Sequence, residues 1–312
     1  MDFTLNELQV MLADSVAKFI ENEYDFDTRQ SYAASERGFS DEVWAQFAEL
    51  GWTAVPFSEE DGGIGGGPVD VMVLMESLAR GLVVEPYLAN IILAGGVLDR
   101  CASTEQKERW LQPIMAGELQ ATLAYNEPQS RYELADVRTT ATRDGEDWRL
   151  NGAKGVVLNG GTADLVIVPA RTSGESCDTN GITLFAVPAE QLTINSYATF
   201  DGLCAAEIEM KDVEVSADNV LGDVDAGFEV LDATIDDATL AVCAEAVGIM
   251  QILTEKTVEY AKQRRQFGVP IGTFQALQHR MVDMLMACEK ARSVLTWAVM
   301  TVNGVADASG MH

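Results

Sequence analysis

The residues with the clearest chemical potential lie in one run, residues 260–279. Arg264 and Arg265 carry guanidinium groups that stay protonated and offer forked donors suited to phosphate oxygens. Phe267 adds an aromatic face, and Gln275 adds an amide that can bond a carbonyl or a ring nitrogen. This combination predicts a grip for a pyrophosphate and an adenine ring. The alternative is a solvated helix end followed by a Gly-Pro turn.

Composition and charge exclude several classes of protein. The chain has 312 residues, 47% of them hydrophobic, which suffices for a large core and for about two domains by length. A formal net charge of -28 repels nucleic acid and acidic membrane surfaces, so neither is expected as a partner. The acidity fits general solubility, a salty cytoplasm or a basic partner equally well.

Cysteine usage and hydropathy bear on metals and location. The five cysteines lie far apart without ligand spacing, so we expect reduced thiols, no disulfide framework and no metal site. No apolar run reaches the roughly 18 residues that a membrane span needs. The N-terminal residues lack the basic region and the hydrophobic region of an export signal. The expected location is the cytoplasm.

The elements that position the 260–279 run follow from the apolar spacing. Helical periodicity and capping signals predict an N-terminal helical domain over 1–119. Short β-rich runs and the turn signals Asp144-Gly145 and Asn151-Gly152 predict an antiparallel sheet domain over 120–224. Helical spacing returns over 225–312 and predicts a helical bundle.

This bundle is expected to be incomplete. Two long helices cannot by themselves close a bundle core. Residues 302–312 lose the helical period and read as a loop that leaves a helix. We therefore expect the natural chain to continue beyond residue 312.

The pattern Arg264-x-x-Phe267-Gly-x-Pro-Ile-x-x-Phe-Gln275, followed by an apolar helix, resembles the flavin-contacting segment of the acyl-CoA dehydrogenase family. The order of helices, sheet and helices is similar to that family over the whole chain. Further matches are Glu127-Pro128, Lys154, Asn159-Gly-Gly161 and Val247-Gly248. The resemblance implies an α+β fold with an N-terminal helical domain, a middle antiparallel β domain and a C-terminal helical bundle.

The resemblance also implies a reaction. Members of the family oxidise acyl-CoA thioesters to trans-2-enoyl-CoA with FAD and pass the electrons to an electron-transferring flavoprotein. A carboxylate must remove the α-proton while hydride leaves the β-carbon, and the thioester carbonyl must be polarised. The expected partners are therefore an acyl-CoA and that flavoprotein.

The segments that would hold the flavin ring depart from the family pattern. The usual Thr-Glu-Pro-Gly-Ala-Gly-Ser-Asp loop appears as Asn126-Glu-Pro-Gln-Ser-Arg-Tyr-Glu133, without its glycines. The usual Trp-Ile-Thr strand appears as Val156-Val-Leu158. Close-approach glycines, a stacking aromatic and a hydroxyl are thus missing. We expect the chain's own flavin-ring pocket to be degraded.

The catalytic base is in doubt as well. Where long-chain and branched-chain members carry an Asp-x-Glu-Arg pattern, this chain has Asp236, Asp237, Ala238 and Thr239. Asp237 is the weak candidate for the base; in other members the base lies in a segment beyond residue 312. Asp236 keeps a position that meets acyl-CoA in the family, although a carboxylate favoured by the helix dipole is an equal alternative. Tyr260 is a second, weak candidate contact for the substrate.

The segment that reaches the ADP half of FAD is intact. In the family, the residues matching Arg264, Phe267 and Gln275 contact an FAD whose flavin ring is held mainly by the neighbouring subunit. We expect this chain to be the small subunit of a heterotetramer with FAD between unlike chains. It looks most like the heteromeric members, such as the small subunit of pimeloyl-CoA dehydrogenase and the steroid-type enzymes. The segments that carry this closer likeness are Arg80-Gly-Leu-Val-Val-Glu-Pro-Tyr87, Arg131-Tyr-Glu-Leu-Ala-Asp-Val137 and Cys243-Ala-Glu-Ala-Val-Gly248.

Two alternatives remain open at this point. The chain could be a self-sufficient homotetrameric dehydrogenase whose base follows residue 312. It could also be a dehydrogenase-like binding or scaffold protein without redox activity.

Overall fold

The structure is a computed structural model that describes residues 4–302. It divides into two compact units. The first comprises residues 4–29, 66–83 and 239–302, and the second comprises residues 30–65 and 84–238. The division into 1–119, 120–224 and 225–312 that the sequence suggests stays a prediction.

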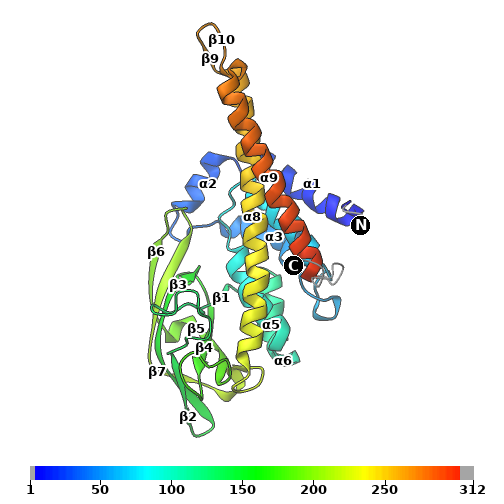
Figure 1. Ribbon diagram of the computed structural model, residues 1–312. Coiled ribbons are helices and arrows are strands. Elements are labelled where there is room, and N and C mark those ends of the chain that lie inside the picture. The colour runs from blue at the N-terminus through cyan, green and yellow to red at the C-terminus, as the bar shows by residue number, and fades with distance from the viewer. Residues whose placement is uncertain (1–3, 303–312) are drawn as a thin grey trace. The chain divides into compact units, whose positions relative to one another are not determined.

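The first unit is helical. It contains α1 (Glu7–Glu23), α4 (Pro68–Ala79), the C-terminal part of α8 (Gly227–Gln263) and α9 (Gln275–Val302) (Figure 1). Asn6 begins α1 with a capping box, in which its side chain accepts a hydrogen bond from the Gln9 amide at 2.8 Å. Pro68 stands in the first turn of α4, where its missing N–H costs nothing.

A polar network sets the register of α4, α8 and α9. The Arg292 guanidinium of α9 donates to the Glu76 carboxylate of α4 at 2.5 Å and to the Gln251 side-chain oxygen of α8 at 2.6 Å. Gln251 in turn donates to Glu255 at 3.0 Å, and the Glu255 carboxylate takes two hydrogen bonds from Arg80 at 2.7 and 3.2 Å. Because both α4 and α8 present their partners one turn apart, sliding any one helix along another would break several of these bonds.

Gly248 lets α8 approach α4 closely. A Cβ atom built there would lie 2.2 Å from the Glu76 carbonyl oxygen and 2.9 Å from the Ala79 Cβ. Both distances are far below van der Waals contact. The missing side chain is therefore a condition of this helix contact.

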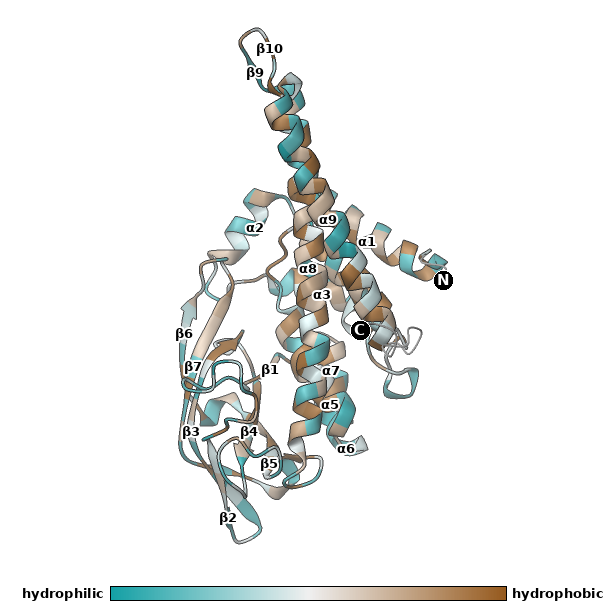
Figure 2. Cartoon of the chain, in the orientation of Figure 1, coloured by the Kyte–Doolittle hydropathy of each residue, from teal (hydrophilic) through white to brown (hydrophobic). Residues whose placement is uncertain are grey.

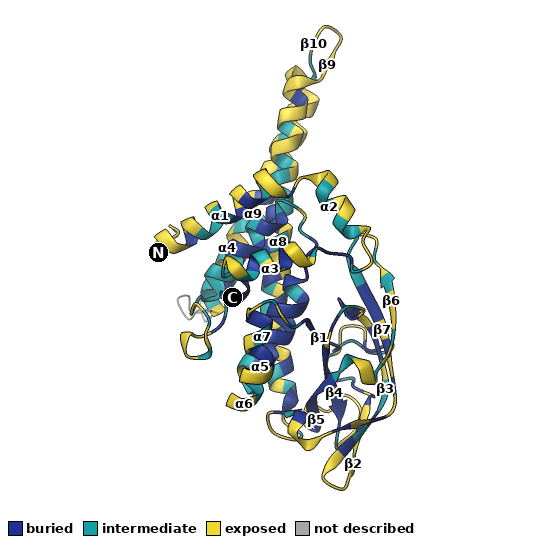
Figure 3. Cartoon of the chain, turned by 180° about the vertical axis from the view of Figure 1, so that it is seen from behind, coloured by how far each residue is buried: buried dark blue, intermediate teal, exposed yellow. Residues whose placement is uncertain are grey.

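The α8–α9 pair carries many exposed apolar side chains. Within α9, the buried residues are Cys288, Leu295 and Val299. Figure 3 shows exposed residues along the ends of α8 and α9 that lead to the hairpin of β9 (Arg265–Gln266) and β10 (Val269–Pro270), and Figure 2 shows that apolar residues are among them. The large exposed apolar residues of the two helices are Val242, Leu253, Tyr260, Leu277, Val282, Leu285, Met286, Val294, Trp297 and Val302. By length and composition alone α8 could also cross a membrane, a property that core helices share.

The second unit packs short helices around an aromatic cluster. Ser40 caps α3 by accepting from the Val43 amide, and Phe47 of α3 packs on Trp52 with ring centroids 4.8 Å apart. Asn90 ties the helical part to the sheet, because its side-chain oxygen accepts from the Ala121 amide at 2.8 Å. The helices in or entering this unit, π- and 3-10 turns included, are α2 (Phe26–Ala33), α3 (Asp41–Glu49), η1 (Trp52–Ala54), η2 (Glu59–Asp61), η3 (Leu88–Gly95), α5 (Gly96–Cys101), α6 (Thr104–Gln106), η4 (Lys107–Leu111), α7 (Gln112–Met115), η5 (Ala189–Gln191) and η6 (Ala217–Asn219).

The rest of the second unit is the expected β domain. Its sheet has the order β6-β7-β3-β2-β4-β5-β8, with β1 paired to β4. The sheet is mixed rather than wholly antiparallel, since β1 runs parallel to β4 and β2 makes one parallel pair with β4. The strands are β1 (Ala121–Leu123), β2 (Thr140–Asp144), β3 (Asp147–Leu158), β4 (Leu165–Arg171), β5 (Ile182–Pro188), β6 (Thr193–Ala198), β7 (Cys204–Val215) and β8 (Val220–Leu221).

One of the two predicted turn signals is wrong. Gly145 stands in the β2–β3 turn at φ +67°, as expected of Asp144-Gly145. Gly152, however, lies inside β3, where the pairing with β7 shifts register between Leu150 and Gly152. A Cβ at Gly152 would come within 2.5 Å of the Thr139 side-chain oxygen, so this glycine serves a bulge and a close approach rather than a turn.

The contact at Gly248 predicts that an alanine there destabilises the fold, the opposite of the usual effect in a helix. In an ordinary helix interior, replacing glycine by alanine stabilises by roughly 0.5–1 kcal/mol. We expect Gly248→Ala to destabilise by about 1–3 kcal/mol instead, because its methyl group overlaps the α4 backbone. Urea unfolding followed by circular dichroism measures the change. Gly155→Ala is the control, because nothing lies within 4 Å of a Cβ there. A Gly248→Ala variant as stable as the wild type would contradict the close contact.

Candidate functional site

The phosphate-binding run predicted from the sequence forms a hairpin where α8 ends and α9 begins (Figure 1). Strands β9 (Arg265–Gln266) and β10 (Val269–Pro270) pair antiparallel, with Phe267 and Gly268 between them at φ +54° and +82°. Two consecutive positive φ angles define a type I′ turn, the tightest hairpin connection. At its base the Ile271 amide donates to the Arg264 carbonyl at 2.8 Å.

The side chains on this hairpin are available for a ligand. Arg264 is exposed and its guanidinium makes no hydrogen bond or ion pair with residues 4–302, and the same holds for the Gln275 amide in the first turn of α9. The Phe267 ring is 92% exposed. Tyr260 lies one turn before Arg264 on α8 and is also exposed. Arg264, Phe267 and Gln275 thus all lie between the end of α8 and the first turn of α9.

The two segments expected to face a flavin ring lie side by side in the second unit. Gly155 donates its amide to the Asn126 carbonyl at 2.9 Å, and the Asn126 side chain donates back to the Gly155 carbonyl at 3.3 Å. Next to this pair, Val156 holds a left-handed backbone at φ +52° with its side chain half exposed. An aliphatic side chain there offers neither a stacking face nor a hydrogen bond.

A buried ion pair anchors the loop that begins at Asn126. The Lys154 ammonium donates to a Glu127 carboxylate oxygen at 2.7 Å and to the Pro169 carbonyl at 2.8 Å, and both charged side chains are at least 98% buried. The Glu127 carboxylate also accepts from the backbone amides of Arg138 at 2.9 Å and Thr139 at 3.1 Å. Gln129 adds a side-chain hydrogen bond at 2.8 Å. This carboxylate is fully occupied within the chain and has a structural role.

The electrostatics of the pair follow from its burial. Burial alone would raise the pKa of Glu127, but the Lys154 charge and the hydrogen bonds from Lys154, Gln129 and Thr139 lower it to about 2. Burial lowers the pKa of Lys154, and the Glu127 carboxylate offsets part of that effect. At neutral pH the two groups therefore form a charged pair.

A second buried cation fixes the far end of the same loop. Among residues 4–302 the Arg171 guanidinium bonds only backbone carbonyls, those of Asp178 and Asn180 at 2.9 Å each, Ala135 at 2.8 Å and Val137 at 3.4 Å. Sequence reasoning missed Arg171 because its partners lie up to 36 residues away in the chain. The strand around it reads as a continuous apolar run that ends in this one charged residue.

The candidate base Asp237 is engaged in an ion pair. Its carboxylate accepts a hydrogen bond from the Arg100 guanidinium of α5, which also donates to the Gly96 carbonyl at 3.1 Å. Ala238, the position of the family glutamate, is buried and has no proton-accepting group. Asp236 is exposed. Of the two candidate positions for the base, one thus lacks a carboxylate and the other has its carboxylate bonded to Arg100.

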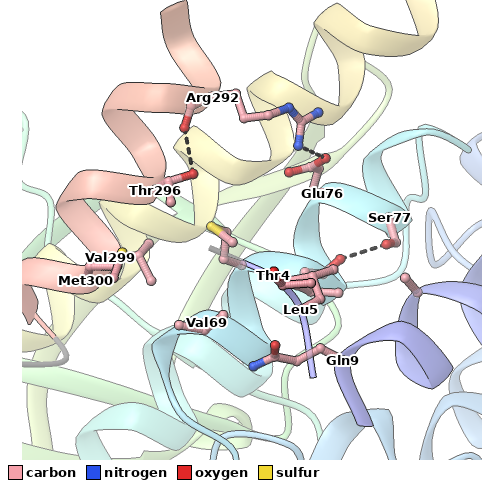
Figure 4. Close-up of a pocket in the computed structure, with 13 residues that line it drawn as sticks. Thr4, Leu5, Gln9, Val69, Glu76, Ser77, Arg292, Thr296, Val299 and Met300 are labelled. Atoms are coloured by element: carbon pink, nitrogen blue, oxygen red, sulfur yellow. Dashed lines mark hydrogen bonds and ion pairs between the residues drawn. The ribbon is translucent and has the colours of Figure 1, made fainter. Parts of the chain in front are cut away.

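A separate cavity of about 530 Å³ lies in the first unit between α1, α4 and α9 (Figure 4). Val69, Val299 and Met300 belong to its apolar wall, and the Glu76–Arg292 ion pair lies at its edge. The cavity shares no residue with the hairpin. Among residues 4–302 there is no group of three or more His, Cys, Asp or Glu side chains placed to hold a metal ion.

Three family models match the chain in order along its length. The acyl-CoA dehydrogenase N-terminal domain matches residues 6–118, the middle domain residues 122–215 and the C-terminal domain residues 225–309. A relative named probable acyl-CoA dehydrogenase YngJ, from Bacillus subtilis, is 31% identical over 95% of this chain and 79% of its own length.

Solved structures agree with this likeness. Butyryl-CoA dehydrogenase from Megasphaera elsdenii superposes with a TM-score of 0.88 at 28% identity, covering 97% of this chain and 82% of that one. A chain of the ChsE4-ChsE5 complex from Mycobacterium tuberculosis superposes with a TM-score of 0.87 at 27% identity, covering 97% of this chain and 80% of that one. The α+β fold expected from the sequence is confirmed.

The Glu127–Lys154 pair predicts a specific response to acid. A depressed pKa of about 2 means that the paired carboxylate stabilises the fold above the unfolded-state value of about 4.5, and that this stabilisation is lost as pH falls towards 2. We expect the free energy of unfolding to fall more steeply over that window in the wild type than in the double variant Glu127→Leu/Lys154→Met. Urea unfolding at stepped pH measures both curves.

Comparing the unfolding free energies of the single and double variants at pH 7 separates the effect of the charge pair from the effect of side-chain packing. Lys154→Met alone leaves a buried carboxylate without its cation and should cost about 3–5 kcal/mol. The double variant should cost less, because no unpaired charge remains. In the pH experiment, the plots of unfolding free energy against pH should differ in slope between the wild type and the double variant. Equal slopes would refute the assigned role of Glu127.

Proposed function

We propose a division of labour that starts from the premise that this chain belongs to the acyl-CoA dehydrogenase family. Members of the family bind FAD and dehydrogenate acyl-CoA thioesters. In our proposal this chain is the small subunit of a heterotetramer, and it lends its 264–275 hairpin to an FAD whose flavin ring lies mainly in a partner subunit. The observation that carries the proposal is the Arg264 guanidinium, exposed on the hairpin and free of partners among residues 4–302.

The residues of the hairpin fit the ADP half of FAD. Arg264 supplies a charge-assisted donor for a diphosphate, Gln275 supplies an amide, and the exposed Phe267 ring supplies an apolar face. The segments at Asn126 and Val156 fit a flavin ring poorly. Their one buried carboxylate, Glu127, is saturated by internal donors, and Val156 has no ring to stack.

The chemistry of the reaction assigns the remaining roles. When bound, FAD would supply the acceptor for the hydride from the β-carbon of the acyl group. This chain holds the diphosphate, and the α-proton goes to a carboxylate of the partner, since Ala238 has none and Asp237 is paired with Arg100. Asp236 and Tyr260 remain candidate contacts for the acyl-CoA. An electron-transferring flavoprotein is the proposed acceptor of the electrons, and the cytoplasm is the proposed location.

Two other functions compete with this one. A self-sufficient homotetramer would need its own base, and a redox-inactive scaffold would need no cofactor. The likeness to a chain of the ChsE4-ChsE5 complex favours a heteromer, because its name describes two different chains together. The 1–119, 120–224 and 225–312 division is the domain arrangement that we propose for it.

Co-expression tests the proposal directly. We expect this chain purified alone to be colourless. Expressed with a second acyl-CoA dehydrogenase chain that carries an intact flavin loop and a helix glutamate, it should give a yellow complex. That complex should reduce an artificial electron acceptor when given an acyl-CoA, whereas neither chain should do so alone. A chain that binds stoichiometric FAD and turns over unaided would instead establish the homotetramer, and a complex without flavin would favour the scaffold.

A single substitution tests the phosphate contact. We expect Arg264→Ala to lower FAD affinity in the assembled complex by roughly 10- to 100-fold, since a hydrogen bond to a charged group is worth about 1.5–3 kcal/mol. The FAD dissociation constant is measured by fluorescence titration of the flavin-free complex. Lys290→Ala is the control, because it removes one exposed positive charge further along α9. Equal FAD affinity in the wild type and Arg264→Ala would argue against the hairpin as the binding element.

A further inference from the structure

Phe267 has a strained backbone. It is a bulky side chain at φ +54°, in the left-handed region where such residues are rarely found. A residue in that region costs on the order of 1–3 kcal/mol and persists only where its surroundings over-determine it. The glycine that follows pays no such cost, since it lacks a Cβ.

The Phe267 ring packs against the ring of Phe274 in the same chain. The two rings meet edge to face, with centroids 6.2 Å apart and planes at 81°. This geometry suits the opposite partial charges of a ring edge and a ring face. The two side chains differ in exposure, since Phe267 is 92% exposed and Phe274 only 38%.

Phe274 is itself fixed by the start of α9. Its carbonyl accepts the amides of Leu277 at 3.0 Å and Gln278 at 3.1 Å, and Gln275 follows it as the first residue of the helix. The Gln278 side chain donates to the Gly272 carbonyl at 2.9 Å, which closes the turn before Phe274. The ring that supports the hairpin tip therefore stands on a rigid helix end.

We propose that Phe274 is a positioning residue, which presets the Phe267 turn for the ADP half of FAD before the partner subunit arrives. This inference rests on the proposed function of the hairpin. Phe274 acts through Phe267, while Arg264 and Gln275 contact the cofactor themselves. A hairpin already in its binding conformation avoids the entropy of ordering the loop on binding.

The first test measures FAD affinity in the assembled complex by fluorescence titration. We expect Phe274→Leu, which keeps bulk and removes the ring, to weaken FAD binding roughly two- to tenfold. Phe274→Tyr should restore it, since the ring edge is kept. The double variant Phe267→Leu/Phe274→Leu should bind FAD no more weakly than Phe267→Leu alone, because Phe274 acts only through the Phe267 ring. Independent, multiplying losses would overturn the positioning role.

The second test needs no flavin. Arg264 and Arg265 place trypsin sites within the hairpin, so the rate of cleavage after them reports how often the turn opens. We expect faster cleavage of the full-length chain in Phe274→Leu than in the wild type, and a wild-type rate in Phe274→Tyr. Equal rates in wild type and Phe274→Leu would overturn the preset turn.

Comparison with Arg264→Ala separates the two proposals. If Arg264→Ala weakens FAD binding and Phe274→Leu does not, the positioning role fails and the function of the hairpin stands. If neither substitution changes FAD affinity, the proposed function itself fails.

Discussion

The first unit depends on the close packing of α8 against α4. Gly248 permits the contact, and the network from Glu76 through Arg292 and Gln251 to Arg80 sets its register. Network members are half-buried rather than sealed, so the value of these bonds is geometric more than energetic. Because α8 and α9 are fixed at this level, the β9–β10 hairpin at their far end is held at a defined place by helices instead of by a loop.

The second unit uses its buried charges differently. Glu127 and Lys154 neutralise each other in the interior, and Arg171 satisfies its donors with backbone carbonyls. Breaking such a pair is costly because it leaves an uncompensated charge in a medium that solvates it poorly. The segment between Asn126 and Thr139 is thus held at both ends by groups that no ligand needs to touch. These internal bonds fix the segment at its two ends.

Much of this could be predicted from local sequence. Apolar spacing predicted helices in the first and last parts of the chain, and β-rich runs predicted most strands of the middle part. Local patterns failed where the partner lies far along the chain. Nothing near Gly152 indicates that Thr139 approaches it, and nothing near Asp237 indicates that Arg100 binds its carboxylate. The same holds for the parallel pairing of β1 with β4, which depends on strand order and not on composition.

Two strained residues show how a shared fold can serve separate tasks. Val156 and Phe267 both hold left-handed backbones that disfavour a bulky side chain. At Val156 the conformation follows a strand bulge and the paired bonds between Asn126 and Gly155, whereas at Phe267 it follows a tight turn. The hairpin and the segments at Asn126 and Val156 are each built by their own local bonds, so substitutions in one need not disturb the backbone of the other.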